Sequence, residues 1–105
     1  MTEDHPVAGV VNHLRFKEAV DPELIAMAER ELTPQMREIE GFQDFYAIQT
    51  SDTDVVLVIL GENVDVLNRV ATEVGSPWMT AHVVPLLAGP SERRIGPTIA
   101  SSRPT

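Results

Sequence analysis

The hydrophobic pattern is most distinctive at Val55–Leu60, an unbroken aliphatic run between a polar stretch and Gly61. A strand with one solvent-exposed face would alternate apolar and polar residues, whereas this run is apolar throughout and rich in Val and Ile. It favours a short central strand covered on both faces. A helix fragment is the less favoured alternative, because the run is short and β-branched. Helices of a 105-residue chain can cover one face, so a second subunit is the simplest cover for the other.

Three further segments have the features of strands. Val7–Phe16 has a period of two that places Val10, Asn12, Leu14 and Phe16 on one face. Phe42–Gln49 is the second strand, and the short polar turn after it predicts an antiparallel hairpin with Val55–Leu60. Arg93–Ala100 is the expected last strand.

The first helix begins at Asp21-Pro22-Glu23, which supplies an N-cap, a proline at the first helical position and an acid near the positive dipole end. Its apolar stripe consists of Leu24, Ala28, Leu32, Met36 and Ile39. Pro34 lies inside the stripe and predicts a kink or a split, and Gly41 is the expected stop.

The second helix is predicted to start at the N-cap Asn63 and to end at Gly75. Ser76-Pro77 then repeats the start signal, which predicts a third helix over Trp78–Leu87. Because Pro85 lies in its second half, Val83–Leu87 is also compatible with a strand.

The element order is therefore βαββαβ, which predicts an α+β, ferredoxin-like fold with an antiparallel sheet and strands one and three in its centre. Residues 7–100 form one domain. The polar, proline-containing segments 1–6 and 101–105 are expected to be flexible termini.

Composition narrows the class of partner. The net charge of −8 argues against nucleic acid and against an anionic membrane surface. The chain has no cysteine, which excludes disulfides and thiolate chemistry. There is neither a signal-peptide pattern nor an apolar run of membrane-spanning length, so we expect a cytoplasmic protein. Residues 76–105 hold one acid and three arginines, so an anionic ligand would prefer that end, or Arg15 and Lys17.

The strand that carries Asn12, the helix that runs into Pro34–Phe42 and the segment Pro77–His82 together resemble the antibiotic-biosynthesis-monooxygenase superfamily. Its members are dimeric α/β barrels. The resemblance implies a homodimer in which two ferredoxin-like sheets pack face to face. It also implies a small-ligand pocket between each sheet and its own helices.

The haem-degrading branch of this superfamily uses an Asn on the first strand, a Trp late in the second helix and a His that ligates haem iron. Asn12 and His82 match the first and the third. The Trp does not match, since Glu73 stands nine residues before His82, where that branch has it. Haem is therefore the alternative cofactor, and no cofactor is the main expectation.

The other branch oxidises phenolic, polycyclic or quinone-like substrates with O₂ and no cofactor. That chemistry needs a base or a hydrogen-bond donor and a dry pocket. The resemblance implies His82 and Asn12 as catalytic residues and Trp78 as a stacking wall, with Tyr46 and Arg15 as further substrate-binding candidates.

Simpler roles stay open for these residues. Asn12 is also compatible with a structural amide, and His82 with a surface or core residue. The three histidines form no cluster with the spacing of metal ligands. The alternative function is a non-catalytic dimer that binds a small aromatic ligand or haem.

Overall fold

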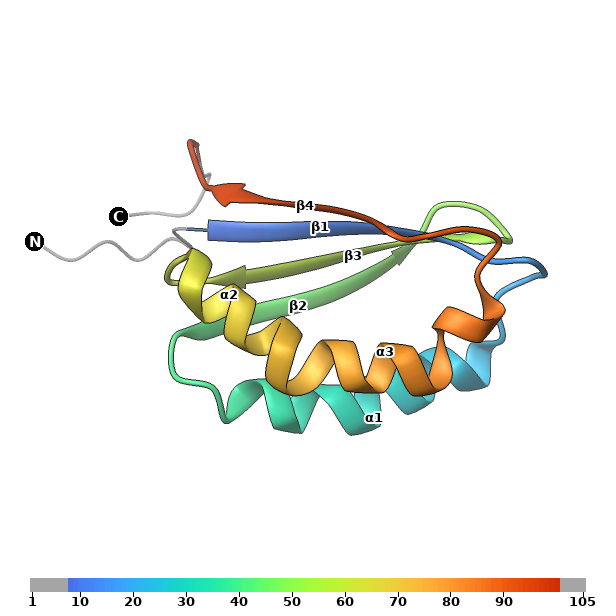
Figure 1. Cartoon of the computed structure of the whole chain (residues 1–105), viewed down its shortest axis with the longest axis horizontal. Coiled ribbons are helices and arrows are strands. Elements are labelled where there is room, and N and C mark those ends of the chain that lie inside the picture. The colour runs from blue at the N-terminus through green and yellow to red at the C-terminus, as the bar shows by residue number, and fades with distance from the viewer. Residues whose placement is uncertain (1–7, 101–105) are drawn as a thin grey trace, which may run out of the picture.

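The computed structural model describes residues 8–100, which form an antiparallel sheet with helices on one face (Figure 1). The termini expected to be flexible, 1–6 and 101–105, lie outside the described residues, as does Val7. The elements in chain order are β1 (Ala8–Arg15), α1 (Pro22–Arg37), β2 (Phe42–Gln49), β3 (Asp54–Gly61), α2 (Val64–Val70), a π-helical segment (Ala71–Gly75), α3 (Ser76–His82), a 3₁₀ turn (Val84–Leu86) and β4 (Glu92–Pro97).

The strand order is β2-β3-β1-β4, and every pair is antiparallel. The ferredoxin-like fold predicted from the sequence is therefore confirmed, with β1 and β3 in the centre. The hairpin of β2 and β3 is also confirmed, and it contains a bulge between Phe42 and Asp44. Val55–Leu60 forms most of β3 and lies inside the sheet, as its composition predicts.

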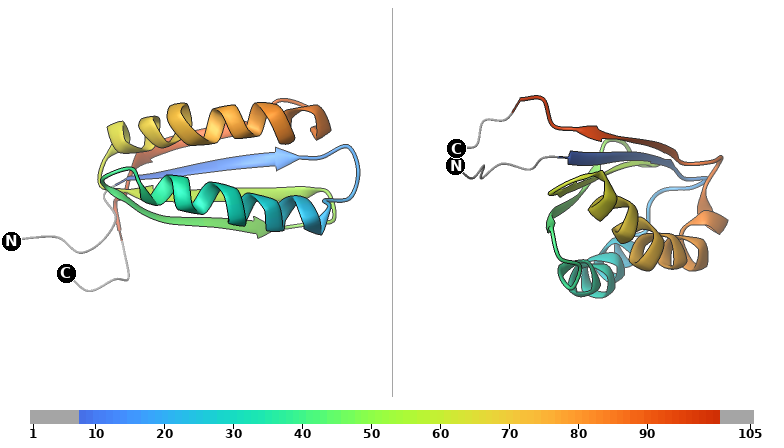
Figure 2. Two further views of the ribbon diagram at one scale, coloured as in Figure 1. Left: turned by 90° about the horizontal axis from the view of Figure 1, so that it is seen from below. Right: turned by 60° about the vertical axis from the view of Figure 1, so that its left-hand side comes forward.

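Two of the three predicted helix starts have their side-chain caps, whereas Ser76 lies inside the continuous helix and is not an N-cap. Asp21 Oδ1 accepts a hydrogen bond of 2.9 Å from the backbone N–H of Glu23, and Asn63 Oδ1 accepts one of 2.9 Å from Val66. Each carboxamide or carboxylate satisfies an N–H that has no partner within its helix. α1 and the run from α2 to α3 lie side by side across one face of the sheet (Figure 2).

The two sheet faces differ in their cover. Leu14 and Val55 face the helices and are 3% and 2% exposed, in a core that also contains Leu32, Met36 and Val70 from the helices. Within residues 8–100, no element covers the other face. Val11, Tyr46 and Ile48 lie there and are each about half exposed.

Three predicted boundaries are corrected. α1 is not split at Pro34, because proline removes only one helical hydrogen bond and the apolar stripe packs on both sides of it; the Gln35 side chain donates to the Glu31 carbonyl at 2.9 Å nearby. Gly75 does not end the second helix, since helical residues continue without a break into α3. The last strand is Glu92–Pro97, shorter than predicted and shifted by one residue at its start.

The segment Val83–Leu87 is neither a full helix nor a strand. α3 ends at His82, and a 3₁₀ turn over Val84–Leu86 follows, with Pro85 inside it. An isolated bridge pairs Leu87 with Phe16. Among residues 8–100, no helix combines the length and the apolar character needed to cross a bilayer.

Candidate functional site

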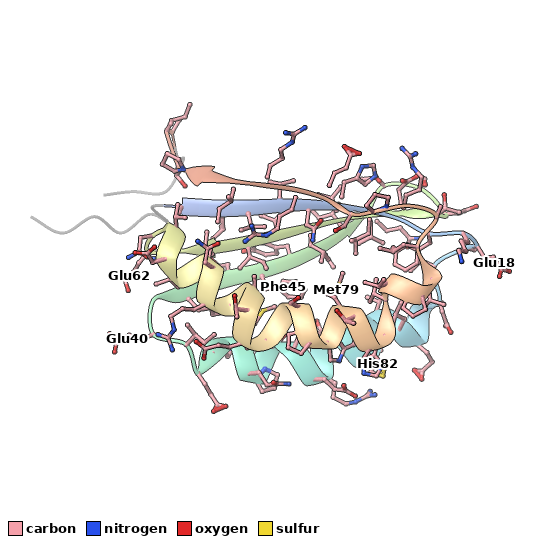
Figure 3. All side chains as sticks on the ribbon, in the orientation of Figure 1. Glu18, Glu40, Phe45, Glu62, Met79 and His82 are labelled. Carbon is pink, nitrogen blue, oxygen red and sulfur yellow. The ribbon has the colours of Figure 1, made fainter. Side chains whose placement is uncertain are left out.

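A cavity of about 240 Å³ lies between the sheet and the helices. Its apolar walls include Phe45 on β2 and Met79 on α3, which Figure 3 shows between the two layers. Its polar lining comes from three places. Asn12 lies on β1, Ser76 and Thr80 lie on α3, and Ser91 and Arg93 lie at the start of β4 or just before it.

Asn12 is at the centre of the sheet wall. It pairs with Leu57 of β3 on one side and with Arg93 of β4 on the other, so the three residues form one row across the sheet. The Oδ1 atom of Asn12 is buried and has no hydrogen-bond partner among the described residues. Buried polar atoms are rarely left unpaired, because each costs about 1–3 kcal/mol, so this acceptor is the candidate contact for a hydrogen-bond donor of a ligand.

Arg93 marks the mouth of the cavity. Its side chain lines both the cavity and a broad open depression outside it, which also includes Asn68, Pro77 and Ala81. Arg93 Nη2 is 3.5 Å from Asn68 Oδ1, which is a long and weak hydrogen bond. The guanidinium can therefore turn from this contact toward a ligand that enters between β4 and α3.

The helical wall includes the π-segment. The backbone N–H of Ser76 donates to the carbonyl of Ala71, five residues earlier, which makes the turn one residue wider than an α-turn. Pro77 follows and has no N–H to donate. Beyond the π-segment, Trp78 and Val83 lie in the core and Met79 packs against it.

The structure gives different surroundings to the two residues that the sequence places together. Trp78 is 8% exposed, and its Nε1 donates to Glu31 Oε1 at 2.8 Å. His82 is exposed on the side of α3 that faces away from the sheet (Figure 3). Its ring lies 4.8 Å from the Trp78 ring, centroid to centroid. Neither side chain lines the cavity.

Tyr46 and Arg15 also lie elsewhere. Tyr46 is 51% exposed on the outer strand β2, beside a groove between β2 and α1. Arg15 is exposed on the open sheet face, 3.8 Å from Asp54. The Ser51 hydroxyl and His13 also hydrogen-bond to the Asp54 carboxylate, and they hold its pKa below the ordinary value. Of the five residues predicted from the sequence, only Asn12 lines the cavity.

The sequence-based prediction missed Arg93 and Thr80. The signal for Arg93 is the period of two in β4, which puts it on the same face as Ile95. That signal identifies a cavity residue only when the register with β1 is known. Thr80 gives no signal, because it is an exposed residue of α3 that lines both the cavity and the open depression.

The arrangement does not fit haem. The predicted iron ligand, His82, points away from the cavity, and the residues that line the cavity include no histidine. Within the described part of the chain, no three His, Asp or Glu side chains are placed to hold a metal ion.

Comparison with known proteins agrees on the fold. No protein-family model and no curated protein sequence matches the chain. Solved structures do match. The monooxygenase from the gene ActVA-Orf6 of Streptomyces coelicolor, in complex with nanaomycin D, is 18% identical; the match covers 95% of this chain and 94% of that chain, with a TM-score of 0.68.

SnoaB of Streptomyces nogalater, a cofactor-independent oxygenase, is 16% identical over 96% of this chain and 97% of its own, with a TM-score of 0.66. NE2512 of Nitrosomonas europaea, a protein of unknown function, is 14% identical over 95% and 96%, with a TM-score of 0.71. The chain therefore has the fold of these monooxygenases, as its resemblance to the antibiotic-biosynthesis-monooxygenase superfamily implies.

Proposed function

We propose that this chain is a cofactor-independent monooxygenase of the antibiotic-biosynthesis type, which oxidises a phenolic or quinone-like fused-ring substrate in the cavity between sheet and helices. A cavity of about 150 Å³ can bind benzene, so about 240 Å³ suits a bicyclic to small tricyclic ring system. The fold shared with two such oxygenases supports the reaction class.

The observation that carries the proposal is the unpaired buried Oδ1 of Asn12 in the sheet wall of the cavity. An amide both accepts and donates, so Asn12 can accept from a phenol O–H and, after rotation of the amide, donate to the phenolate. Arg93 at the mouth favours the anionic form of the substrate through its positive charge. Hydrogen bonds to a charged oxygen are worth about 1.5–3 kcal/mol each.

The residues that line the cavity include no carboxylate and no imidazole, so the acidic proton of the substrate leaves to water at the mouth. The resulting carbanion forms a C–O bond with O₂, and protonation gives a hydroperoxide. Loss of the second C–H proton with cleavage of the O–O bond leaves a carbonyl and releases water. The balance is CH₂ + O₂ → C=O + H₂O, in which the substrate supplies all four electrons.

An oxygen electrode with a panel of anthrones, naphthols and hydroxynaphthoquinones tests this function. We expect metal-free O₂ consumption, one O₂ per carbonyl formed, and a loss of about 10-fold or more in kcat/KM for Arg93→Gln. Arg94→Gln is the matched control, because Arg94 is on the same strand but pairs with Val11 on the opposite sheet face. Equal losses of kcat/KM in both variants would show that Arg93 has no specific role in the proposed site.

The role predicted for His82 stays a prediction, and we leave this residue out of the proposed site because of its outward position. His82→Ala separates the two views with the same assay. A large loss of turnover at unchanged stability would show that His82 takes part in the reaction.

The absence of a titratable base from the cavity lining favours one second candidate, a non-catalytic protein that binds a small phenol. Thermal-shift titrations distinguish the two. Saturable stabilisation without O₂ consumption by any member of the panel would favour the binding protein.

We also propose that the protein is a homodimer through its open sheet face. Val11, Tyr46 and Ile48 are 46–51% exposed there, next to the partly buried Val56 and Val58. A second copy would cover these side chains with an identical surface, as two-fold dimers do. Its cytoplasmic location stays a prediction from the sequence.

Light scattering tests the dimer. We expect about twice the 11.6 kDa chain mass for the wild type and a monomer for Val58→Asp, which places a charge in the apolar centre of the face. Glu62→Lys, an exposed charge change just after β3, is the control. A wild-type monomer at micromolar concentration would contradict the proposal.

A further inference from the structure

A small void of about 30 Å³ lies behind the cavity, in the core between α1, the sheet and α3. Every residue that lines it is apolar, among them Leu24, Ala28, Leu57, Trp78 and Val83. We call it the apolar void. It shares Leu32, Phe45, Leu57 and Met79 with the cavity, so the two spaces adjoin.

Water is a poor occupant of this void. A single water needs about 10–15 Å³ of such space, which is available, but it also needs two to four polar partners. The polar atom of the Trp78 side chain, Nε1, is already bonded to Glu31 Oε1. A void without polar partners stays dry and takes small apolar molecules instead.

The void also adjoins the outer surface. Ile25, Ala28, Phe45 and Ala47 line both the apolar void and the groove between α1 and β2. Phe45 is shared by the groove, the void and the cavity, so its ring lies where the three meet. Glu29, Arg30, Thr33 and Arg37 also line this groove, so its apolar part next to the void consists of the four shared residues.

We propose that the apolar void is a docking site for dioxygen, which enters from the α1–β2 groove and binds next to the organic substrate. The inference rests on the proposed oxygenase function and adds a separate site and entrance for the gas. Its volume suits a diatomic molecule, and its position behind Phe45 and Met79 lets O₂ reach the cavity while the polar mouth is filled by the ring substrate.

The binding part is tested without any turnover, by methyl NMR under O₂ pressure with N₂ at equal pressure as the reference. Because O₂ is paramagnetic, we expect faster relaxation at the methyl groups of Leu14, Val55 and Val83, which line the void, than at those of Leu67 and Val70, which are also buried but lie outside it. Equal relaxation in the two sets would overturn the site.

Ala28→Leu fills the void from α1 and should remove the selective relaxation. Ala26→Leu is its matched control, since Ala26 is exposed on the same helix. If Ala28→Leu does not fold, Ala47→Val narrows the void from β2 with a residue that suits a strand. Selective relaxation that persists in a folded filling variant would overturn the assignment.

Steady-state kinetics at varied O₂ tests the delivery. We expect the filling variant to raise KM for O₂ about 3-fold or more while KM for the ring substrate stays within 2-fold. An unchanged KM for O₂ would overturn the delivery role. If no substrate supports O₂ consumption, the proposed function fails, and the NMR experiment still decides whether the void binds the gas.

Discussion

Replacing Asn12 by Leu should stabilise the protein while it removes ligand binding. The Oδ1 atom of Asn12 is buried without a partner, so the folded state loses the hydration of this atom and gains no hydrogen bond. An unpaired buried group costs about 1–3 kcal/mol. The larger Leu side chain has room, because Asn12 faces the cavity of about 240 Å³.

The expected gain is therefore about 1–3 kcal/mol in the free energy of unfolding. For a domain of this size, each kcal/mol raises Tm by about 4–8 °C. Urea unfolding monitored by Trp78 fluorescence and calorimetry measure the two quantities. In the O₂ assay, Asn12→Leu should lose at least about 10-fold in kcat/KM, because a hydrogen bond that the substrate anion accepts is gone. Stability and function thus change in opposite directions, as is common at binding sites.

Asn68→Leu is the control, since Asn68 is an exposed residue of α2 and should change stability by no more than about 0.5 kcal/mol. A variant Asn12→Leu that is less stable than the wild type would show that the amide is a structural residue with partners in solution. If Asn12→Leu is more stable than the wild type but retains its turnover, Asn12 has no part in the reaction.

Three further predictions concern stability. Gly41→Ala should cost more than about 1 kcal/mol by urea unfolding, because Gly41 has φ of +95° and a Cβ there would approach Val66 Cγ2 to 2.7 Å; a neutral result would contradict the strain. Glu31→Ala should cost about 1 kcal/mol, because it leaves the buried Trp78 N–H unpaired; equal loss in a Trp78→Phe background would exclude this cause. Asp54→Asn should destabilise the fold at pH 6, with a difference that narrows as pH falls through the lowered pKa, below 3.8, where the wild-type carboxylate is also neutral. A difference of the same size at pH 3 would refute the link to ionisation.

The fold could be predicted from local patterns because each one reports the environment of its own residues. Val55, Leu57 and Ile59 of β3 are apolar because they face the helical layer. Val56 and Val58 lie on the open face, which the proposed second copy would cover. Asp21 and Asn63 cap helices through hydrogen bonds that span only two or three residues. The split that the sequence allowed at Pro34 was wrong for the opposite reason. Its effect depends on packing along the whole of α1, which offsets one missing hydrogen bond.

The site was harder to predict because its parts depend on phase and register between elements. An α-helical spacing from Val74 places Trp78 and His82 on the inner side together, which is why the sequence groups them. In the structure Trp78 is buried and bonds to Glu31, whereas His82 is exposed at the end of α3, so neither lines the cavity. Gly75 and Pro77 looked like a helix end and a new start, although here they belong to a widened turn that carries the helix onward. A proline that follows a glycine and a serine within an apolar stripe is therefore compatible with a π-segment inside one continuous helix as well as with a break.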